Sequence, residues 1–143
     1  MIHFPIEFQA SSKASQGMQT PWKGGSPNLP EITLAIPKEF EGPGNGYSPE
    51  DLYALALENC FIATFKVMAE RSRLEFESII VEVTLTVDRN EKKVPWMAKT
   101  DFKVTLTGAS NPDKASRLLA KTETSCFVLN SVKTEKIFHY EIK

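Results

Sequence analysis

The sequence contains few of the residues that mark specialised classes of protein. Among 143 residues there are two cysteines and two histidines, so neither a disulfide framework nor a cysteine-rich metal site is expected. His3 and His139 lie near opposite ends of the chain, and neither has ligand-like spacing to a cysteine. The formal net charge is -1, without a strongly acidic or basic run, which argues against nucleic-acid binding.

Long apolar runs are also scarce. The most apolar stretch, residues 54–69, is interrupted by Glu58, Asn59 and Lys66, and we expect it to be too short to span a bilayer. Residues 1–5 lack the basic and apolar regions of a signal peptide. We therefore expect a cytoplasmic protein with no membrane partner.

The composition is that of a globular protein: 41% of the residues are hydrophobic and 24% are charged. At this length the chain can bury a core without covalent links, and no linker or internal repeat divides it. We expect a single domain over residues 1–143.

The first part of the chain predicts a small β meander. Apolar and polar residues alternate over residues 2–8, which indicates a half-buried strand, with Pro5 favouring an edge position or a bulge. A short second strand is expected around residues 18–22, within a segment rich in Ser, Gly and Pro. Ile32, Leu34 and Ile36 predict a third strand.

A long helix follows the meander. The glycine-rich segment 42–46 lacks the Lys-Ser/Thr ending of a phosphate-binding loop and is interpreted as a flexible connector. Ser48 and Pro49 are typical of an N-cap and a first helical position, and acidic residues follow. Since residues 54–69 are apolar on nearly all sides, this helix should lie inside the fold.

The second half alternates strands and helices without a regular βαβ order, which argues against a doubly wound parallel sheet. The overall order βββ-α-ββ-α(α)-β predicts an α+β fold. The expected elements are strands over 81–87 and 102–106 with a turn at 90–93, a helix from Asn111 to Thr124, a buried turn or short helix at 126–129, and a strand over 138–142.

The two cysteines are the only evident source of chemistry. Taken alone, a pair of cysteines is better interpreted as two separate buried thiols, although disulfides in a reducing compartment tend to be catalytic or redox-sensing. Cys60 lies twelve residues beyond Ser48, ~18 Å along the predicted helix, where the helix dipole no longer lowers a thiol pKa. A reactive Cys60 therefore needs a separate cation nearby.

Several segments together resemble the OsmC/Ohr family. That family has a strand ending in proline, a Gly-rich loop, a Pro-Glu-x-Leu helix start, a cysteine on the long helix and a second cysteine motif. The matching segments are Ile32–Pro37, Gly42–Gly44, Ser48–Leu52, Cys60–Phe61 and Ser125–Ser131.

The resemblance implies an OsmC-like fold, with antiparallel sheets around a long buried helix, and an intertwined homodimer. It also implies a cofactor-free, thiol-dependent peroxidase for organic, fatty-acid-type hydroperoxides. Cys60 would attack the peroxide and become a sulfenic acid, and Cys126 would resolve it as a disulfide. A dithiol reductant, typically a lipoylated protein in this family, would restore both thiols. Phe61, Phe65 and Met68 are candidates for an apolar substrate lining, although core packing explains them better.

Glu50 matches a family glutamate that orients an activating arginine. It precedes Cys60 by ten residues, or about 15 Å on one straight helix, so it should act from a neighbouring subunit. Its alternative role is to complement the N-terminus of the helix.

The chain departs from the family pattern in one important place. All of its arginines follow Cys60, and the segment that holds the family arginine offers Lys13 and Lys23 as candidates for stabilising the thiolate. Phe127 also replaces the usual proline after Cys126. Two functions follow: the peroxidase, or a family member without that activity that binds a small apolar ligand at its dimer interface.

Overall fold

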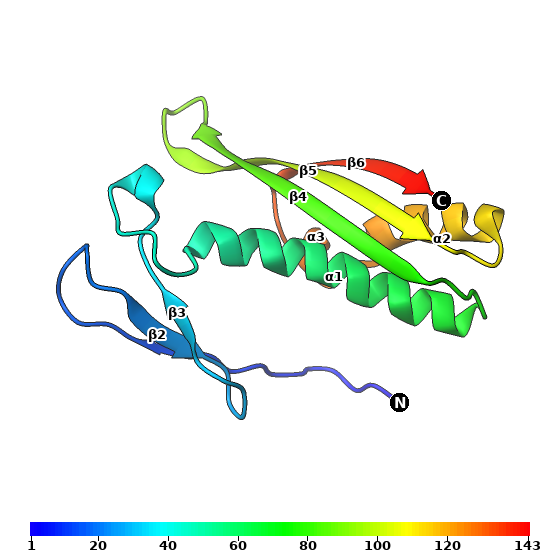
Figure 1. The fold of residues 1–143 in the computed structure, drawn as a ribbon, viewed down its shortest axis with the longest axis horizontal. Helices are drawn as coiled ribbons and strands as arrows, with labels where there is room; N and C mark the ends of the chain where they lie inside the picture. Colours follow the sequence, from blue (N-terminus) through cyan, green and yellow to red (C-terminus); the bar gives the residue numbers. More distant parts are fainter. The chain divides into compact units, whose positions relative to one another are not determined.

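The computed structural model describes residues 1–143, which divide into two compact units. The first unit comprises Met1–Leu52 and the second Tyr53–Lys143, and each is described by itself. Figure 1 shows the chain from the blue N-terminus to the red C-terminus. Whether residues 1–143 fold as one domain stays a prediction.

The first unit is built around a small antiparallel sheet, as the sequence predicts. Its strands are β1 (Ser11–Lys13), β2 (Trp22–Gly25) and β3 (Ile32–Leu34), in the order β1-β2-β3. Lys13 faces Lys23 in the β1–β2 register. Only the third strand falls where the sequence places it: β2 begins at Trp22 rather than near residue 18.

The strand predicted over residues 2–8 is wrong. This segment has no regular secondary structure, its side chains are exposed, and β1 begins only at Ser11. An alternating pattern describes which side chains could share a face, whereas a strand also needs the backbone of a neighbour for its hydrogen bonds. In this unit that neighbour pairs with residues 11–13 instead.

The glycine-rich loop folds back on the end of the third strand, and its flexibility stays a prediction. It follows the 3₁₀ turn η1 (Lys38–Phe40), and the Gly42 N–H donates to the Pro37 carbonyl at 3.0 Å. A Cβ on Gly42 would meet the Ile36 carbonyl oxygen at 2.1 Å. Glycine is therefore needed here because the loop folds closely back on the end of the third strand.

Ser48 caps the long helix α1 (Pro49–Arg71), as predicted. Its hydroxyl accepts from the Asp51 N–H at 3.0 Å, and the Asp51 carboxylate accepts from the Ser48 N–H at 2.9 Å. This reciprocal pair satisfies two backbone donors at the helix start, a contribution typically worth ~1 kcal/mol.

The second unit contains a three-stranded sheet in the order β4-β5-β6. Its strands are β4 (Ser78–Arg89), β5 (Pro95–Thr107) and β6 (Glu135–Ile142). β4 and β5 form an antiparallel hairpin, but β5 and β6 are parallel, which corrects the expectation of purely antiparallel sheets. The helices α2 (Pro112–Ser125) and α3 (Phe127–Asn130) form the crossover that a parallel pair requires.

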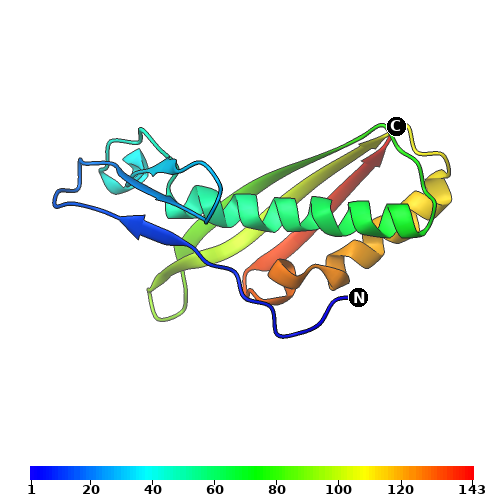
Figure 2. The ribbon, with the colours of Figure 1, turned by 90° about the horizontal axis from the view of Figure 1, so that it is seen from below.

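The core of the second unit lies between one face of this sheet and the helices. Figure 2 shows α1 in front of the strands when the molecule is seen from below. Each fully buried large apolar side chain contributes about 1.5–3 kcal/mol to stability. The buried residues are Leu57, Phe61, Phe65 and Ala69 of α1, Val81, Phe102, Val104 and Leu106 of the sheet, Ala115 and Leu119 of α2, and Leu74, Cys126 and Leu129.

By length and composition alone α1 could cross a membrane, because it runs for 23 residues. The apolar stretch over residues 54–69 is thus part of a longer helix, and whether the chain meets a membrane stays untested. The helix buries Leu57, Phe61, Phe65 and Ala69 in the core of the second unit, and 22% of its most apolar window is buried.

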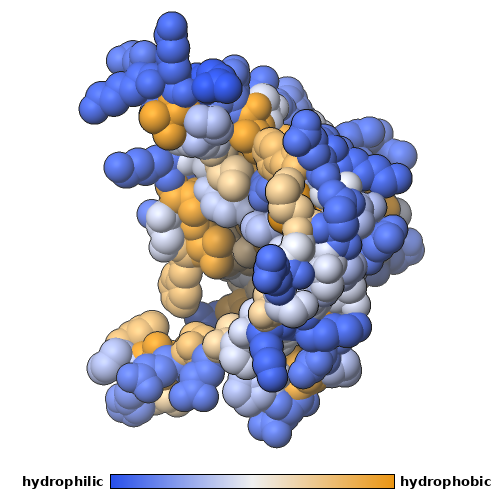
Figure 3. Space-filling view, turned by 90° about the vertical axis from the view of Figure 1, so that its left-hand side faces the viewer, coloured by the Kyte–Doolittle hydropathy of each residue, from blue (hydrophilic) through white to orange (hydrophobic).

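The turn of the β4–β5 hairpin is strongly polar, and it forms the hydrophilic top of the face in Figure 3. The Asn90 side chain accepts from the backbone N–H groups of Lys92 and Val94 at 2.9 and 3.0 Å. This closes the turn that the sequence predicts at residues 90–93.

Candidate redox site

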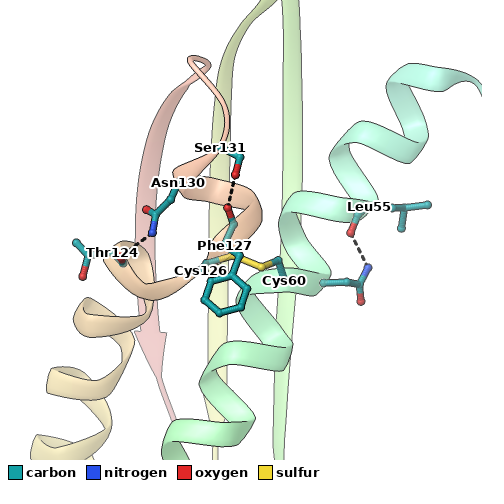
Figure 4. Close-up of a disulfide and its surroundings, with 8 residues drawn as sticks. Leu55, Cys60, Thr124, Cys126, Phe127, Asn130 and Ser131 are labelled. Carbon is teal, nitrogen blue, oxygen red and sulfur yellow. Dashed lines mark hydrogen bonds between the residues drawn. A yellow bond between two sulfur atoms is a disulfide. The ribbon is translucent and has the colours of Figure 1, made fainter. Parts of the chain in front are cut away.

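The structure joins Cys60 of α1 to Cys126 by a disulfide. Their Cα atoms lie 6.0 Å apart, within the range that a disulfide spans. Figure 4 shows the bridge between α1 and the turn that connects α2 with α3. Two cysteines 66 positions apart in the sequence are therefore brought into bonding reach, and the interpretation of two separate thiols is not borne out by this geometry.

The two cysteines differ in burial. Cys126 is fully buried in the core of the second unit, whereas Cys60 is half-buried at the margin of that core. On α1 the preceding Asn59 is exposed and the following Phe61 is fully buried. The Cys60 side of the bridge is thus the side that solvent reaches.

Local hydrogen bonds hold the backbone around Cys126. The Asn130 N–H donates to the Cys126 carbonyl at 3.0 Å, and the Asn130 side chain donates to the Thr124 carbonyl at 3.0 Å. The Ser131 hydroxyl donates to the Phe127 carbonyl at 2.7 Å (Figure 4). These bonds satisfy the backbone carbonyls of Thr124, Cys126 and Phe127, where one helix ends and the next begins.

A tyrosine of β6 contacts neighbours of both cysteines. The Tyr140 hydroxyl donates to the Glu123 carboxylate at 2.5 Å, and its ring centroid lies 6.3 Å from that of Phe61. Burial, the hydrogen bond to Glu123 and the charge of Glu123 all raise the pKa of Tyr140, so the phenol remains a donor at neutral pH. Sequence reasoning missed this pair, since only the chain's path brings residues 123 and 140 together.

A second tyrosine fixes the chain beyond α3. The Tyr53 and Thr134 hydroxyls lie 2.6 Å apart, and the buried Thr134 hydroxyl donates to the Met97 carbonyl at 2.7 Å. Since Thr134 uses its proton there, Tyr53 is the donor to Thr134. This pair anchors the residues that lead into β6.

The stretch of α1 around Cys60 carries no positive charge. The residues one turn before and after it are Ala56, Leu57, Ala63 and Thr64. Glu58 lies two residues before Cys60, and burial raises the pKa of its carboxyl group. A cation that stabilises the Cys60 thiolate must therefore come from outside this stretch of helix.

The other predicted site residues lie in the first unit. Lys13 and Lys23 face each other across β1 and β2, and the Lys23 Nζ donates to the Thr33 hydroxyl at 2.6 Å. Glu50 lies in the first turn of α1, where its charge complements the helix N-terminus. The disulfide thus unites two of the five predicted residues, and the roles of Lys13, Lys23 and Glu50 stay predictions.

The aromatic residues considered as a substrate lining belong to the core. Phe61 and Phe65 are fully buried, and Phe65 packs against Phe76 with ring centroids 5.3 Å apart. The Met68 sulfur lies 3.7 Å from the Thr122 hydroxyl, whose proton goes to the Leu118 carbonyl at 2.7 Å. Packing therefore accounts for all three positions.

Comparison with protein families identifies this architecture. The model of the OsmC-like protein family matches residues 42–141, which include both cysteines. The chain belongs to the OsmC-like family. Its relatives include the uncharacterized protein YmaD of Bacillus subtilis, 33% identical over 108 residues, covering 70% of this chain and 69% of that protein. An organic hydroperoxide resistance protein-like 2 of Staphylococcus epidermidis is 27% identical over 95 residues, covering 66% of each.

Solved structures of OsmC-like proteins share the fold. An OsmC-like protein of unknown function from Vibrio cholerae superposes with a TM-score of 0.84 at 19% identity, covering 96% of this chain and all of that one. An organic hydroperoxide resistance protein from Legionella pneumophila gives a TM-score of 0.70 at 19% identity, covering 97% and 99% of the two chains. The predicted α+β, OsmC-like fold is confirmed, and family membership supports a peroxide-related redox role.

Proposed function

We propose that this OsmC-like protein is a thiol-dependent peroxidase that reduces organic hydroperoxides through Cys60 and Cys126. The observation that carries the proposal is the reach between the two cysteines, with Cα atoms 6.0 Å apart and a bond between their sulfurs. A chain with this geometry can store the two electrons that reduction of one peroxide bond requires.

The proposed reaction has two steps. The Cys60 thiolate attacks the distal oxygen of the hydroperoxide, the O–O bond breaks, and the alcohol leaves as Cys60 becomes a sulfenic acid. The Cys126 thiol then attacks the Cys60 sulfur, forming the disulfide and releasing water. The half-buried position of Cys60 suits the first step, because the peroxide must reach it, and the buried Cys126 suits a resolving role.

A dithiol reductant, such as a lipoylated protein, closes the proposed cycle. Its first thiolate attacks the sulfur that solvent reaches, which is Cys60, and Cys126 leaves as the thiolate. The second thiol of the reductant then displaces Cys60 and takes the disulfide away. An external thiol has no comparable path to the buried Cys126.

The proposal requires a positive charge beside Cys60, since burial without one raises a thiol pKa. We propose Lys13 or Lys23 for this role, with Glu50 contributed by the partner chain of a homodimer. Lysine acts as a point charge and lacks the forked geometry of the family arginine, so we expect slower attack than an arginine would support. A cytoplasmic location also remains part of the proposal.

The direct test counts thiols before and after one equivalent of an organic hydroperoxide is added to the reduced protein. We expect two thiols per chain to disappear while the molecular size stays unchanged. Cys60→Ser should lose turnover with a lipoyl dithiol yet keep its size, whereas Cys126→Ser should lose one thiol and accumulate a sulfenic acid that dimedone traps. Hydrogen peroxide is the matched substrate for measuring the preference for organic peroxides.

Unchanged thiols after treatment would refute the peroxidase. A protein that keeps its thiols would then be tested for binding of a small apolar ligand at a dimer interface, the alternative that the missing arginine favours. Lys13→Met and Lys23→Met, assayed separately, distinguish the two candidate cations: the relevant variant should react with peroxide more slowly, with the pKa of the Cys60 thiol raised.

A further inference from the structure

The β6 side chain Tyr140 links the two helices that bring the cysteines together. Its ring packs beside Phe61, the residue that follows Cys60 on α1, at a centroid distance of 6.3 Å. Its hydroxyl donates at 2.5 Å to Glu123, which precedes Cys126 by three residues at the end of α2. One residue therefore contacts a near sequence neighbour of each cysteine.

We propose that Tyr140, through its hydrogen bond to Glu123, is a positioning residue that keeps Cys126 within bonding reach of Cys60 when the disulfide is open. It touches neither sulfur in the proposed reaction and acts through the last turn of α2.

The surroundings of Tyr140 make it a firm support for such a bond. Its ring also stacks with that of Phe138 at 6.2 Å, and Phe138 in turn stacks on the fully buried Phe102 at 4.6 Å. The hydroxyl is thus presented to α2 by an aromatic cluster that belongs to the sheet. On the same turn of α2 the Thr122 hydroxyl, which donates to the Leu118 carbonyl at 2.7 Å, also lies 3.7 Å from the Met68 sulfur of α1.

The effect of this bond depends on the redox state. In the disulfide form the covalent link itself keeps the end of α2 beside α1, so the phenol adds little restraint. In the dithiol form only non-covalent contacts hold the two helices together there. Removing the hydroxyl should therefore free the dithiol form more than the disulfide form, which lowers the effective concentration of one thiol at the other.

This inference rests on the proposed function only in assuming that turnover uses the Cys60–Cys126 couple, and its test needs no peroxide. The protein is equilibrated with mixtures of dithiothreitol and its oxidised form, and thiols are counted after acid quenching. One dithiothreitol is oxidised for each protein disulfide reduced, so the electrons balance. A failed peroxidase assay would leave this measurement intact.

We expect Tyr140→Phe to lower the equilibrium constant for disulfide formation about tenfold, or ~30 mV in a two-electron potential. Glu123→Ala should shift the constant in the same direction and no further than Tyr140→Phe, because the phenol then keeps only its 3.4 Å contact with the Leu119 carbonyl. The double variant should show no additional loss, and Glu123→Gln should restore part of the effect, because its carbonyl oxygen still accepts. The rate of sulfenic acid resolution should fall with the equilibrium constant, while the rate of the first peroxide step should not.

Tyr53→Phe is the matched control, since it removes a phenol that donates to Thr134 in the same unit, away from the last turn of α2. It should destabilise the reduced protein but change the disulfide equilibrium less than about twofold. The proposal is overturned if Tyr140→Phe leaves the equilibrium constant unchanged, or if Tyr53→Phe shifts it equally. The latter result would assign the effect to a general loosening of the unit.

Discussion

Reducing the disulfide should cost this protein a large share of its stability. The bond joins residues 66 positions apart, and closing a loop of that length removes conformational entropy from the unfolded chain. The chain-entropy relation gives ~4 kcal/mol at 25 °C for such a loop. By thermodynamic linkage, the fold favours formation of the bond by the same amount, or about 10³-fold relative to the unfolded chain.

Urea denaturation at one protein concentration tests this value. A chain of this size loses about 2 kcal/mol of unfolding free energy per molar urea, so oxidation should raise the midpoint by about 2 M. Cys126→Ser is the control, and its midpoint should not respond to reductant. A difference below about 0.5 M between oxidised and reduced protein would refute the reasoning. It would mean that the folded chain does little to hold the two thiols together.

Two further predictions concern residues of α1. Cys126 is fully buried and Cys60 is half-buried. In folded proteins, the Cys60 thiol that Cys126→Ser retains should therefore react with a bulky aromatic disulfide at least about tenfold faster than the Cys126 thiol that Cys60→Ser retains. Equal rates would show that burial does not protect Cys126. Burial raises the pKa of Glu58, so the native state binds more protons than the unfolded state just above the ordinary carboxyl pKa of 4.5, and this residue lowers stability as the pH rises. Glu58→Gln should therefore increase the melting temperature over that of the wild type by more at pH 7 than at pH 4. A smaller increase at pH 7 than at pH 4 would contradict the assigned sign.

Local signals in the sequence predict much of the second unit. The β4–β5 hairpin follows from alternation, and the start of α2 follows from Asn111, whose side chain accepts from the Lys114 N–H at 3.0 Å. Such signals depend on neighbours along the chain, so they can be found in one dimension. The parallel pairing of β6 with β5 has no local signal, because it depends on the path that the crossover takes.

The candidate site also contains some residues that local motifs predict and others that only long-range packing brings together. Motif contexts single out Cys60 and Cys126, but the contact between Tyr140 and Glu123 arises only when β6 is laid beside α2. The N-terminal pattern of Ile2 to Phe8 shows the opposite case, in which a clear local signal gives no strand, because β2 pairs with residues 11–13 instead. Sequence patterns thus predict which residues can form an element, and long-range packing decides which of them do.

The placement of the reactive sulfur on α1 leaves little tolerance for a shift in sequence. A thiol grafted one step earlier, at the exposed Asn59, would be open to every oxidant in solution, and one step later, at Phe61, it would be sealed from any reagent. At position 60 the thiol is half-buried, between these two extremes. Transferring this chemistry to another helical scaffold would therefore require the reactive cysteine on the same helix face, at the edge of the core, as well as the second cysteine.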